Sequence, residues 1–284
     1  MFSQRVEIAL SPCPNDVFIL SGLILGSIET TLEVGFIFAD IEELNTWALE
    51  GRFSVIKASF ALYPQIASDY EIMGCGSAMG FGLGPLLVSL REVSLNPTNE
   101  NSTNKRVALP GRFTTANFLM DFLFPQVYEK IYLPYHEIIP ALLARKVDYG
   151  VLIHEGRFVF EKYGLKLVAD LGKLWEEATK LPLPLGGFFI KRLLPEELKR
   201  TLLRSFRKSL EFAQKNRKEV YFLLKQHAQE LEPEVIFKHV DTYVNRFTYK
   251  LSEEAVESLR VFFKYLRFVF NPKRDIWEYE DGIY

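Results

Sequence analysis

The sequence has little cysteine, no excess of basic charge and no long apolar run. Its two cysteines, Cys13 and Cys75, have no Cys-x-x-Cys partner and no metal-like cluster around them, which excludes a disulfide framework or a cysteine-rich metal motif. The formal net charge of -2 argues against a nucleic acid or an anionic membrane as partner. No segment approaches about 18 uncharged apolar residues, so no membrane span is expected.

A secretory leader is also not expected, because no basic segment precedes an apolar stretch and a small-residue cleavage site. A mature form with its leader removed is the alternative. A strand begins almost at once, at Val6. We therefore expect a cytoplasmic protein with free thiols. Cys13 lies in a strand-to-helix turn, where a helix N-terminus could lower its thiol pKa. A packing role for Cys13 is nevertheless favoured over a nucleophilic one.

The length of the chain, its composition and the order of its segments fit an α/β protein. Its 284 residues, with 48% hydrophobic and 14% aromatic content, allow two lobes or one large domain. Four segments share one order of apolar strand, polar break and helix start. They are residues 6–10 followed by 11–16, 54–58 followed by 59–61, 105–109 followed by 110–116, and 151–153 followed by 154–157. Ligands bind at the carboxyl ends of parallel strands, so the four breaks predict a common site.

The last of these breaks holds the candidate catalytic residue. His154 ends an apolar strand and precedes a Glu-Gly-Arg turn. Imidazole has an unperturbed pKa of about 6.5, so it can accept a proton near neutral pH. The alternative is a structural histidine in the core or at the surface. The other histidines, His136, His227 and His239, are expected to be ordinary surface or helix residues, and no metal site is predicted.

The other breaks supply candidate binding groups. Asn15 and Ser59 can position hydrogen bonds, and amides at the helix start near 114–116 can hold a carboxylate or an oxyanion. Arg112 and Arg157 are candidate partners for a substrate carboxylate, with bracing of a lobe as the alternative role. A glycine-rich run at 74–85 precedes a strand instead of a helix, which favours a crossover over a phosphate-binding loop.

The pattern along the chain predicts two α/β lobes. Lobe 1 comprises residues 1–92 together with 188–284, which are mainly amphipathic helices, and lobe 2 comprises residues 105–185. The polar stretch at 93–104 is expected to be a surface loop. A chain that crosses twice between two such lobes predicts a solute-binding architecture with a ligand cleft and hinge closure.

Several longer strings resemble one enzyme family. They are residues 11–16 (Ser-Pro-Cys-Pro-Asn-Asp), 44–51, 110–116, 152–158 and 175–186. Together they closely resemble the 1,4-dihydroxy-6-naphthoate synthases of the futalosine route to menaquinone, over about residues 5–250. The resemblance implies a fold like that of type II periplasmic binding proteins. It also implies conversion of cyclic dehypoxanthinylfutalosine to 1,4-dihydroxy-6-naphthoate with release of a three-carbon sugar fragment, without cofactor or metal.

The resemblance also implies roles for particular residues. The catalytic histidine of the family falls on His154, and its ligand-contacting positions fall on Lys57, Ala58, Ser59, Thr115 and Ala116. The loop at 96–104 and the chain beyond about 248 depart from the family pattern. The expected partner is a small-molecule substrate, and a homodimer is left open.

Two other classes remain as alternatives. One is the sister family that dehydrates chorismate, which shares the fold, and the other is a non-catalytic solute-binding protein. The Pro-Cys-Pro-Asn-Asp and Ile-His-Glu-Gly-Arg strings favour the naphthoate enzyme over both.

Overall fold

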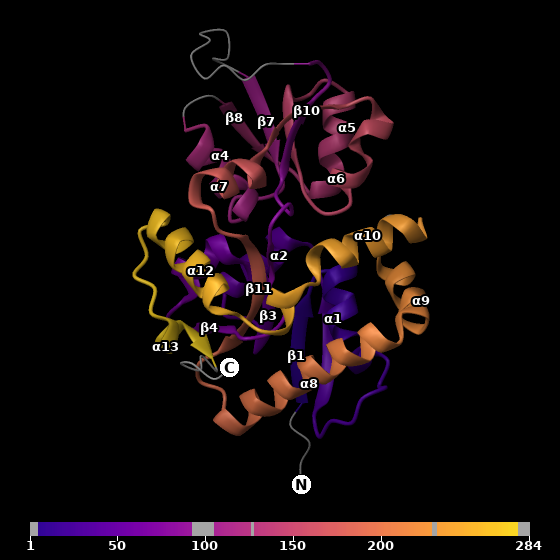
Figure 1. Cartoon of the computed structure of the whole chain (residues 1–284), viewed down its shortest axis with the longest axis vertical. Helices are drawn as coiled ribbons and strands as arrows, with labels where there is room; N and C mark the ends of the chain where they lie inside the picture. The colour runs from indigo at the N-terminus through magenta and orange to yellow at the C-terminus, as the bar shows by residue number, and fades with distance from the viewer. Residues whose placement is uncertain (1–4, 93–104, 126–127, 229–231, 278–284) are drawn as a thin grey trace.

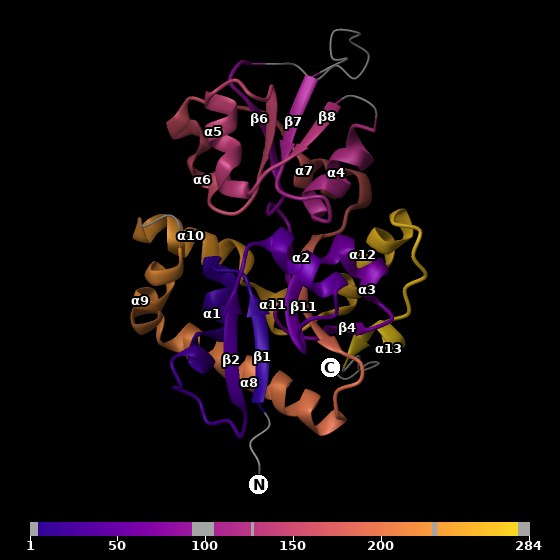
Figure 2. The same ribbon diagram turned by 180° about the vertical axis from the view of Figure 1, so that it is seen from behind.

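The computed structural model describes residues 5–92, 105–125, 128–228 and 232–277. They form two lobes, which lie one above the other in Figure 1 and are seen from behind in Figure 2. Each lobe is built on its own mixed β-sheet. The predicted two-lobed α/β fold is therefore confirmed, while the surface loop expected at 93–104 lies outside the described residues.

Lobe 1 contains a seven-stranded sheet in the order β12–β4–β11–β3–β1–β2, with β5 paired to β11 beside this path. The strands are β1 (Arg5–Leu10), β2 (Glu33–Phe38), β3 (Val55–Ser59), β4 (Tyr70–Met73), β5 (Ala78–Gly80), β11 (Leu183–Lys191) and β12 (Ile276–Trp277). Strand β1 runs parallel to both β2 and β3. The carboxyl ends of these three strands therefore lie at one edge of the sheet.

Lobe 2 contains a five-stranded sheet in the order β10–β6–β9–β7–β8. The strands are β6 (Leu86–Ser89), β7 (Lys105–Leu109), β8 (Tyr128–Tyr132), β9 (Tyr149–Leu152) and β10 (Lys166–Asp170). Strand β7 is parallel to β8 and β9. As in lobe 1, the turns that follow the parallel strands are brought to one edge.

Helices pack on the sheets according to the alternation of strand residues. The described helices are α1 (Pro14–Ile24), α2 (Ile41–Leu49), α3 (Tyr63–Ile66), α4 (Thr115–Leu123), α5 (Ile138–Leu143), α6 (Gly156–Val159), α7 (Leu171–Thr179), α8 (Glu196–Lys215), α9 (Arg217–His227), α10 (Pro233–Tyr243), α11 (Arg246–Tyr249), α12 (Glu253–Tyr265) and α13 (Pro272–Asp275). Ile8 of β1 joins a core with α1, α8, α9 and α10. Ala9, pointing the other way, joins a core with α2 and α12 that continues into α4 and α7 of lobe 2.

The first boundary between the lobes differs from the expected one. We expected the strand at 86–90 to belong to lobe 1, but β6 pairs antiparallel with β9 and β10 in the sheet of lobe 2. The chain therefore leaves lobe 1 before Leu86. It returns earlier than residue 188, because β11 already pairs with β5 at Leu183. A short apolar strand is compatible with either sheet, so its composition does not identify its partners.

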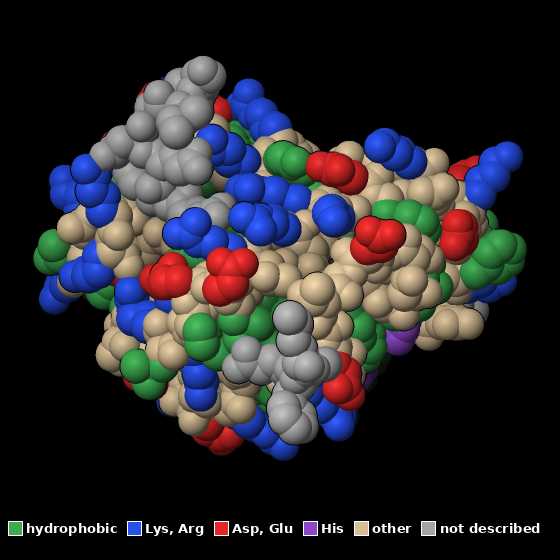
Figure 3. Space-filling model, turned by 90° about the horizontal axis from the view of Figure 1, so that it is seen from below, with side chains coloured by type: hydrophobic (Ala, Val, Ile, Leu, Met, Phe, Trp, Pro, Cys, Tyr) green, Lys and Arg blue, Asp and Glu red, His purple; other side chains and the backbone are tan. Residues whose placement is uncertain are grey.

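Basic side chains gather on the lower end of the molecule, which Figure 3 shows from below. Helix α8 lies at this end (Figure 1) and has exposed Arg200, Arg204 and Lys208, while its opposite side packs Leu203 and Phe206 into the core. This arrangement agrees with the expected amphipathic helix and solvated basic face. No helix in the described ranges has the length and apolarity needed to cross a membrane.

The backbones of two glycines touch where the chain passes between the lobes. A Cβ atom built on Gly172 of α7 would lie 2.4 Å from the Cα atom of Gly84. We expect Gly172→Ala to lower the free energy of unfolding by about 1–3 kcal/mol, the usual cost of overpacking. Gly35→Ala is the control, because its new Cβ would meet only a Glu7 side-chain atom at 3.8 Å. Urea unfolding of both variants would measure the difference, and equal stability would contradict the close contact.

Candidate active site

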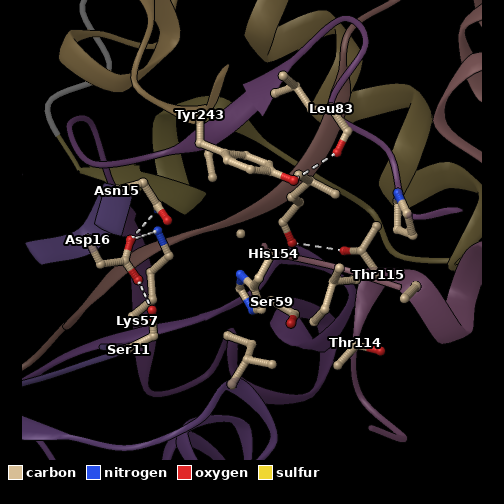
Figure 4. Close-up of a pocket in the computed structure, with 17 residues that line it drawn as sticks. Ser11, Asn15, Asp16, Lys57, Ser59, Leu83, Thr114, Thr115, His154 and Tyr243 are labelled. Carbon is tan, nitrogen blue, oxygen red and sulfur yellow. Dashed lines mark hydrogen bonds and ion pairs between the residues drawn. The ribbon is translucent and has the colours of Figure 1, made fainter. Parts of the chain in front are cut away.

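A cavity lies between the lobes, and residues of both lobes line it (Figure 4). The turns after β1 and β3 contribute from lobe 1, and the start of α4 and the turn after β9 contribute from lobe 2. Six residues expected at the site line this cavity, namely Asn15, Lys57, Ser59, Thr115, Ala116 and His154. The four polar breaks of the sequence thus meet at one place.

Three other expected site residues do not line the cavity. Ala58 is fully buried and packs in the core between the lobes. Arg112 is exposed, with its guanidinium 5.5 Å from the centre of the Tyr132 ring. Arg157 is half-buried, with its guanidinium 5.5 Å from the centre of the Phe158 ring. Neither arginine therefore lines the cavity, although Arg157 is hydrogen-bonded to Tyr243, which does.

A buried ion pair forms one wall of the cavity. The Nζ atom of Lys57 lies 2.7 Å from Oδ1 of Asp16, and both side chains are almost completely buried. Asp16 also accepts hydrogen bonds from Ser11 Oγ at 2.6 Å and from Asn15 Nδ2 at 2.8 Å. Lys57 donates a further bond to the carbonyl of Gly76. Removing two charges from water is tolerated when such additional bonds satisfy them.

Ser59 is held by an asparagine that the expected site did not include. Asn45 of α2 donates from Nδ2 to Ser59 Oγ at 3.2 Å and accepts the backbone amide of Ser59 at 2.9 Å. These two bonds fix both the backbone and the hydroxyl of Ser59 at the end of β3. Asn45 belongs to the string at 44–51 that carried the family resemblance, but no local motif indicated its contact with Ser59.

A carboxylate of lobe 1 binds the backbone of lobe 2 beside the cavity. Glu42 of α2 accepts a hydrogen bond from the amide of Arg112 at 2.6 Å, and burial raises the pKa of Glu42. A Cβ atom on Gly111 would lie 2.3 Å from Glu42 Oε2, so the absence of a side chain at Gly111 permits this approach. We call this contact the Glu42 bridge.

The first turn of α4 faces the cavity from lobe 2. Thr114 is the N-cap, and its side chain accepts a hydrogen bond from the amide of Asn117. Thr115 donates from its hydroxyl to the carbonyl of Leu185 in β11 at 2.9 Å. Helix starts present backbone amide donors and the positive end of the helix dipole. This geometry suits a carboxylate or a developing oxyanion.

His154 lies two residues beyond the end of β9, in the left-handed backbone region with φ of 52°. Burial lowers the pKa of His154 to about 4, against an opposing contribution from the Asp16 charge. The imidazole is therefore neutral at pH 7, with a lone pair available to accept a proton. The ring of Tyr135 meets it edge-on, with the ring centres 4.8 Å apart.

Cys13 contacts the imidazole of His154. Its sulfur lies 3.2 Å from Nδ1 and 3.7 Å from Nε2. The lone pairs of the two nitrogens point away from the ring in different directions, so a sulfur in line with one nitrogen would lie much farther from the other. The similar distances therefore show that the sulfur is not in line with either lone pair. Burial, followed by the charges of Glu155 and Asp16, raises the Cys13 pKa well above its usual value. The expectation that the helix N-terminus could lower the Cys13 pKa is therefore wrong, and the thiol is neutral.

His239 and Tyr243 are two further residues whose positions the sequence did not indicate. His239, expected to be an ordinary surface or helix residue, is fully buried and lies 2.9 Å from Asn15 Oδ1 through its Nε2 atom. Tyr243 lines the cavity from the same helix. Their i, i+4 spacing on α10 places both side chains on one face, but that spacing alone does not indicate a site.

No group of three or more histidine, cysteine or acidic side chains within the described ranges is arranged to hold a metal ion. That the protein acts without a metal or a cofactor stays a prediction, because the arrangement of side chains does not test what the reaction requires.

The buried Lys57–Asp16 pair leads to a stability prediction. We expect Asp16→Asn to lower the free energy of unfolding by about 3–5 kcal/mol, because it leaves the Lys57 ammonium buried without its counter-charge. Glu177→Gln is the control, since Lys173 and Glu177 form an exposed pair 3.9 Å apart whose loss should cost less than about 1 kcal/mol. Chemical denaturation at pH 7 measures both, and similar small losses would contradict a tightly held buried pair.

Comparisons with known proteins agree on a relationship along nearly the whole chain. The family described as menaquinone biosynthesis matches residues 6–267. A 1,4-dihydroxy-6-naphthoate synthase of Thermus thermophilus is 40% identical over 252 residues, covering 89% of this chain and 90% of the relative. The Streptomyces coelicolor enzyme of the same name is 36% identical, covering 92% of each chain.

Solved structures show the same architecture. A crystal structure of an Archaeoglobus fulgidus protein is similar with a TM-score of 0.88 at 34% identity, covering 94% of this chain and 98% of that one. An alkanesulfonate-binding protein of Xanthomonas axonopodis has a TM-score of 0.71 at 12% identity, covering 98% of this chain and 99% of that one. The second similarity shows the fold alone, which is the periplasmic-binding-protein-like fold. The family match and the two synthases show that this chain belongs to the menaquinone biosynthesis family.

Proposed function

We propose that this protein is a carbon–carbon lyase that converts cyclic dehypoxanthinylfutalosine to 1,4-dihydroxy-6-naphthoate, with His154 as general base. The names of the Thermus and Streptomyces relatives support the product. The observation that carries the proposal is the neutral imidazole of His154 in a cavity between the lobes. Relatives named as biosynthetic enzymes also support a cytoplasmic site of action over a periplasmic one.

The groups around the cavity suit this chemistry. Aromatising a bicyclic ketone while a carbon–carbon bond breaks requires removal of a proton from carbon and stabilisation of an oxyanion. His154 would accept the proton. The amides at the start of α4 would hold a carboxylate or the oxyanion, and the Lys57 ammonium and Ser59 hydroxyl would donate from the opposite lobe. With Thr115, Ala116 and Asn15, these residues form the proposed substrate site.

Substrate entry requires movement of the lobes. The cavity has a volume of about 80 Å³, whereas sites for drug-sized ligands measure roughly 300–1,000 Å³. A nucleoside-derived bicyclic substrate therefore fits only after the lobes separate. Two-lobed folds open in this way by a hinge at the connecting segments.

The first test is replacement of the proposed base. We expect His154→Gln to lower kcat by about 10²–10⁴-fold, because the general base is lost, while circular dichroism and thermal melting show a folded protein. His227→Gln serves as control, since His227 ends α9 and stacks on Phe38. Ultraviolet detection of the naphthoate after incubation with the proposed substrate measures turnover.

The same assay separates the alternative functions. Chorismate consumption by the wild-type protein would indicate the dehydratase, and binding without turnover of either compound would indicate a solute-binding protein. Activity of His154→Gln close to that of the wild type would refute the assignment of the base.

The second test is the pH profile. Because the pKa of His154 lies at about 4, the imidazole stays deprotonated as the pH falls from 7 to about 5, below the usual histidine pKa of about 6.5. We expect kcat/KM to remain nearly constant over that interval and to fall only at lower pH, when the base becomes protonated. An acid-side midpoint near pH 6.5 would show that His154 is not the buried neutral base described above.

A further inference from the structure

A second histidine, His239 of α10, is buried behind one wall of the cavity. It is fully buried, and its ring centre lies 4.6 Å from that of Tyr243. Its Nε2 atom lies 2.9 Å from Oδ1 of Asn15. His239 does not line the cavity, whereas Asn15 does. The histidine therefore has no direct contact with a ligand in the cavity, and its hydrogen bond acts through Asn15.

The hydrogen bonds of Asn15 determine which nitrogen of His239 carries the proton. The carboxylate of Asp16 is paired with Lys57, and an ionised carboxylate only accepts hydrogen bonds. The group that faces Asp16 at 2.8 Å must therefore be the amide NH₂ of Asn15. The carbonyl oxygen of Asn15 then faces His239 and accepts, so Nε2 of His239 must donate.

The surroundings of His239 also keep its other nitrogen without a proton. Nδ1 is buried and has no hydrogen-bond partner among the described residues, so an added N–H there would be buried without an acceptor. Burial, together with the positive charge of Arg157, lowers the pKa of His239 well below its usual value. One neutral tautomer, with the proton on Nε2, satisfies these constraints.

The bonds continue from His239 to groups that face the cavity. Nε2 of His239 holds the Asn15 carbonyl, the Asn15 amide holds Asp16, and Asp16 holds Lys57. Figure 4 shows Asn15, Asp16 and Lys57 together on one side of the cavity. Without the donor on His239, the carbonyl oxygen of Asn15 would be buried without a partner, so the Asn15 side chain could leave the position in which it holds Asp16. Loss of the bond between Asn15 and Asp16 would weaken the fixed position of Lys57.

We propose that His239 is a positioning residue, which orders Asn15 and Lys57 for the substrate by donating a hydrogen bond from Nε2. The proposal rests on the proposed function, because it treats Asn15 and Lys57 as substrate contacts. It assigns His239 no contact with the substrate and no proton transfer.

The kinetic test compares two substitutions at His239. The side-chain NH₂ of glutamine in His239→Gln can replace the Nε2 donor, so we expect kcat/KM within about threefold of the wild type. His239→Leu removes the donor and leaves Asn15 Oδ1 buried without a partner, so we expect kcat/KM to fall about tenfold or more, mainly through KM. If His239 only filled space, leucine would be tolerated better than glutamine.

A spectroscopic test does not depend on turnover. Nitrogen-15 chemical shifts of labelled histidine distinguish the two neutral tautomers and the protonated ring, and the His239 signal is identified by its loss in His239→Gln. The sequence has only four histidines, so the spectrum is simple. We expect the Nε2–H tautomer throughout pH 5.5–8. An Nδ1–H tautomer, or protonation with an ordinary midpoint, would overturn the proposal whatever the activities of the variants.

The outcomes separate this proposal from the proposed function. If the wild-type protein makes no naphthoate, the proposed function fails, and the tautomer still decides whether His239 orders Asn15. If the wild type is active and the two His239 variants lose equal activity, or His239→Leu loses none, the positioning role is refuted while the lyase assignment stands.

Discussion

A lysine ammonium and an aspartate carboxylate meet 2.7 Å apart in the interior of lobe 1, at the ends of two neighbouring parallel strands. Lys57 comes from β3, and Asp16 from the first turn of α1, so the pair ties strand β3 to the start of α1. A buried charge is strongly destabilising when it has neither a counter-charge nor hydrogen bonds. The surrounding hydroxyl, amide and carbonyl groups are therefore required, and these same groups form one wall of the cavity.

The main elements of the site could be predicted because their signals are local. An apolar strand followed by a polar turn and a helix start is visible in adjacent residues, and parallel strands bring such turns together. This order is enough to predict that Ser59, Thr115 and His154 lie near one another at the strand ends. The helix start at Thr114 could be expected for the same reason, since a threonine N-cap is recognised from sequence.

The remaining features depend on contacts between distant parts of the chain. His239 meets Asn15 across 224 positions, and nothing near either residue indicates that contact. The strand at Leu86 pairs in lobe 2 because of its neighbours and not because of its own residues. Arg112 points outward, since its backbone amide, and not its guanidinium, faces Glu42. The positive charge of Arg112 suggested a contact with the ligand, but its side chain does not line the cavity.

The Glu42 bridge would link the proposed closure of the lobes to binding. The carboxylate of Glu42 holds the amide of Arg112, close to the start of α4. Glu42 also accepts a hydrogen bond from Asn45, which in turn positions Ser59. Helix α2 and the segment that leads into α4 are thus joined to each other when the lobes are together. Opening would break this contact, and closing would restore it together with the substrate site.

The backbone at His154 has a consequence for the balance between stability and activity. A residue other than glycine at φ of 52° carries a conformational cost, of the order of 1–3 kcal/mol for sparsely populated backbone regions. Glycine would adopt this conformation freely. If variants were selected only for resistance to heat, glycine would therefore be favoured over the proposed base at this position. The molecule is held slightly below the stability that its fold could reach, at the residue proposed as the general base.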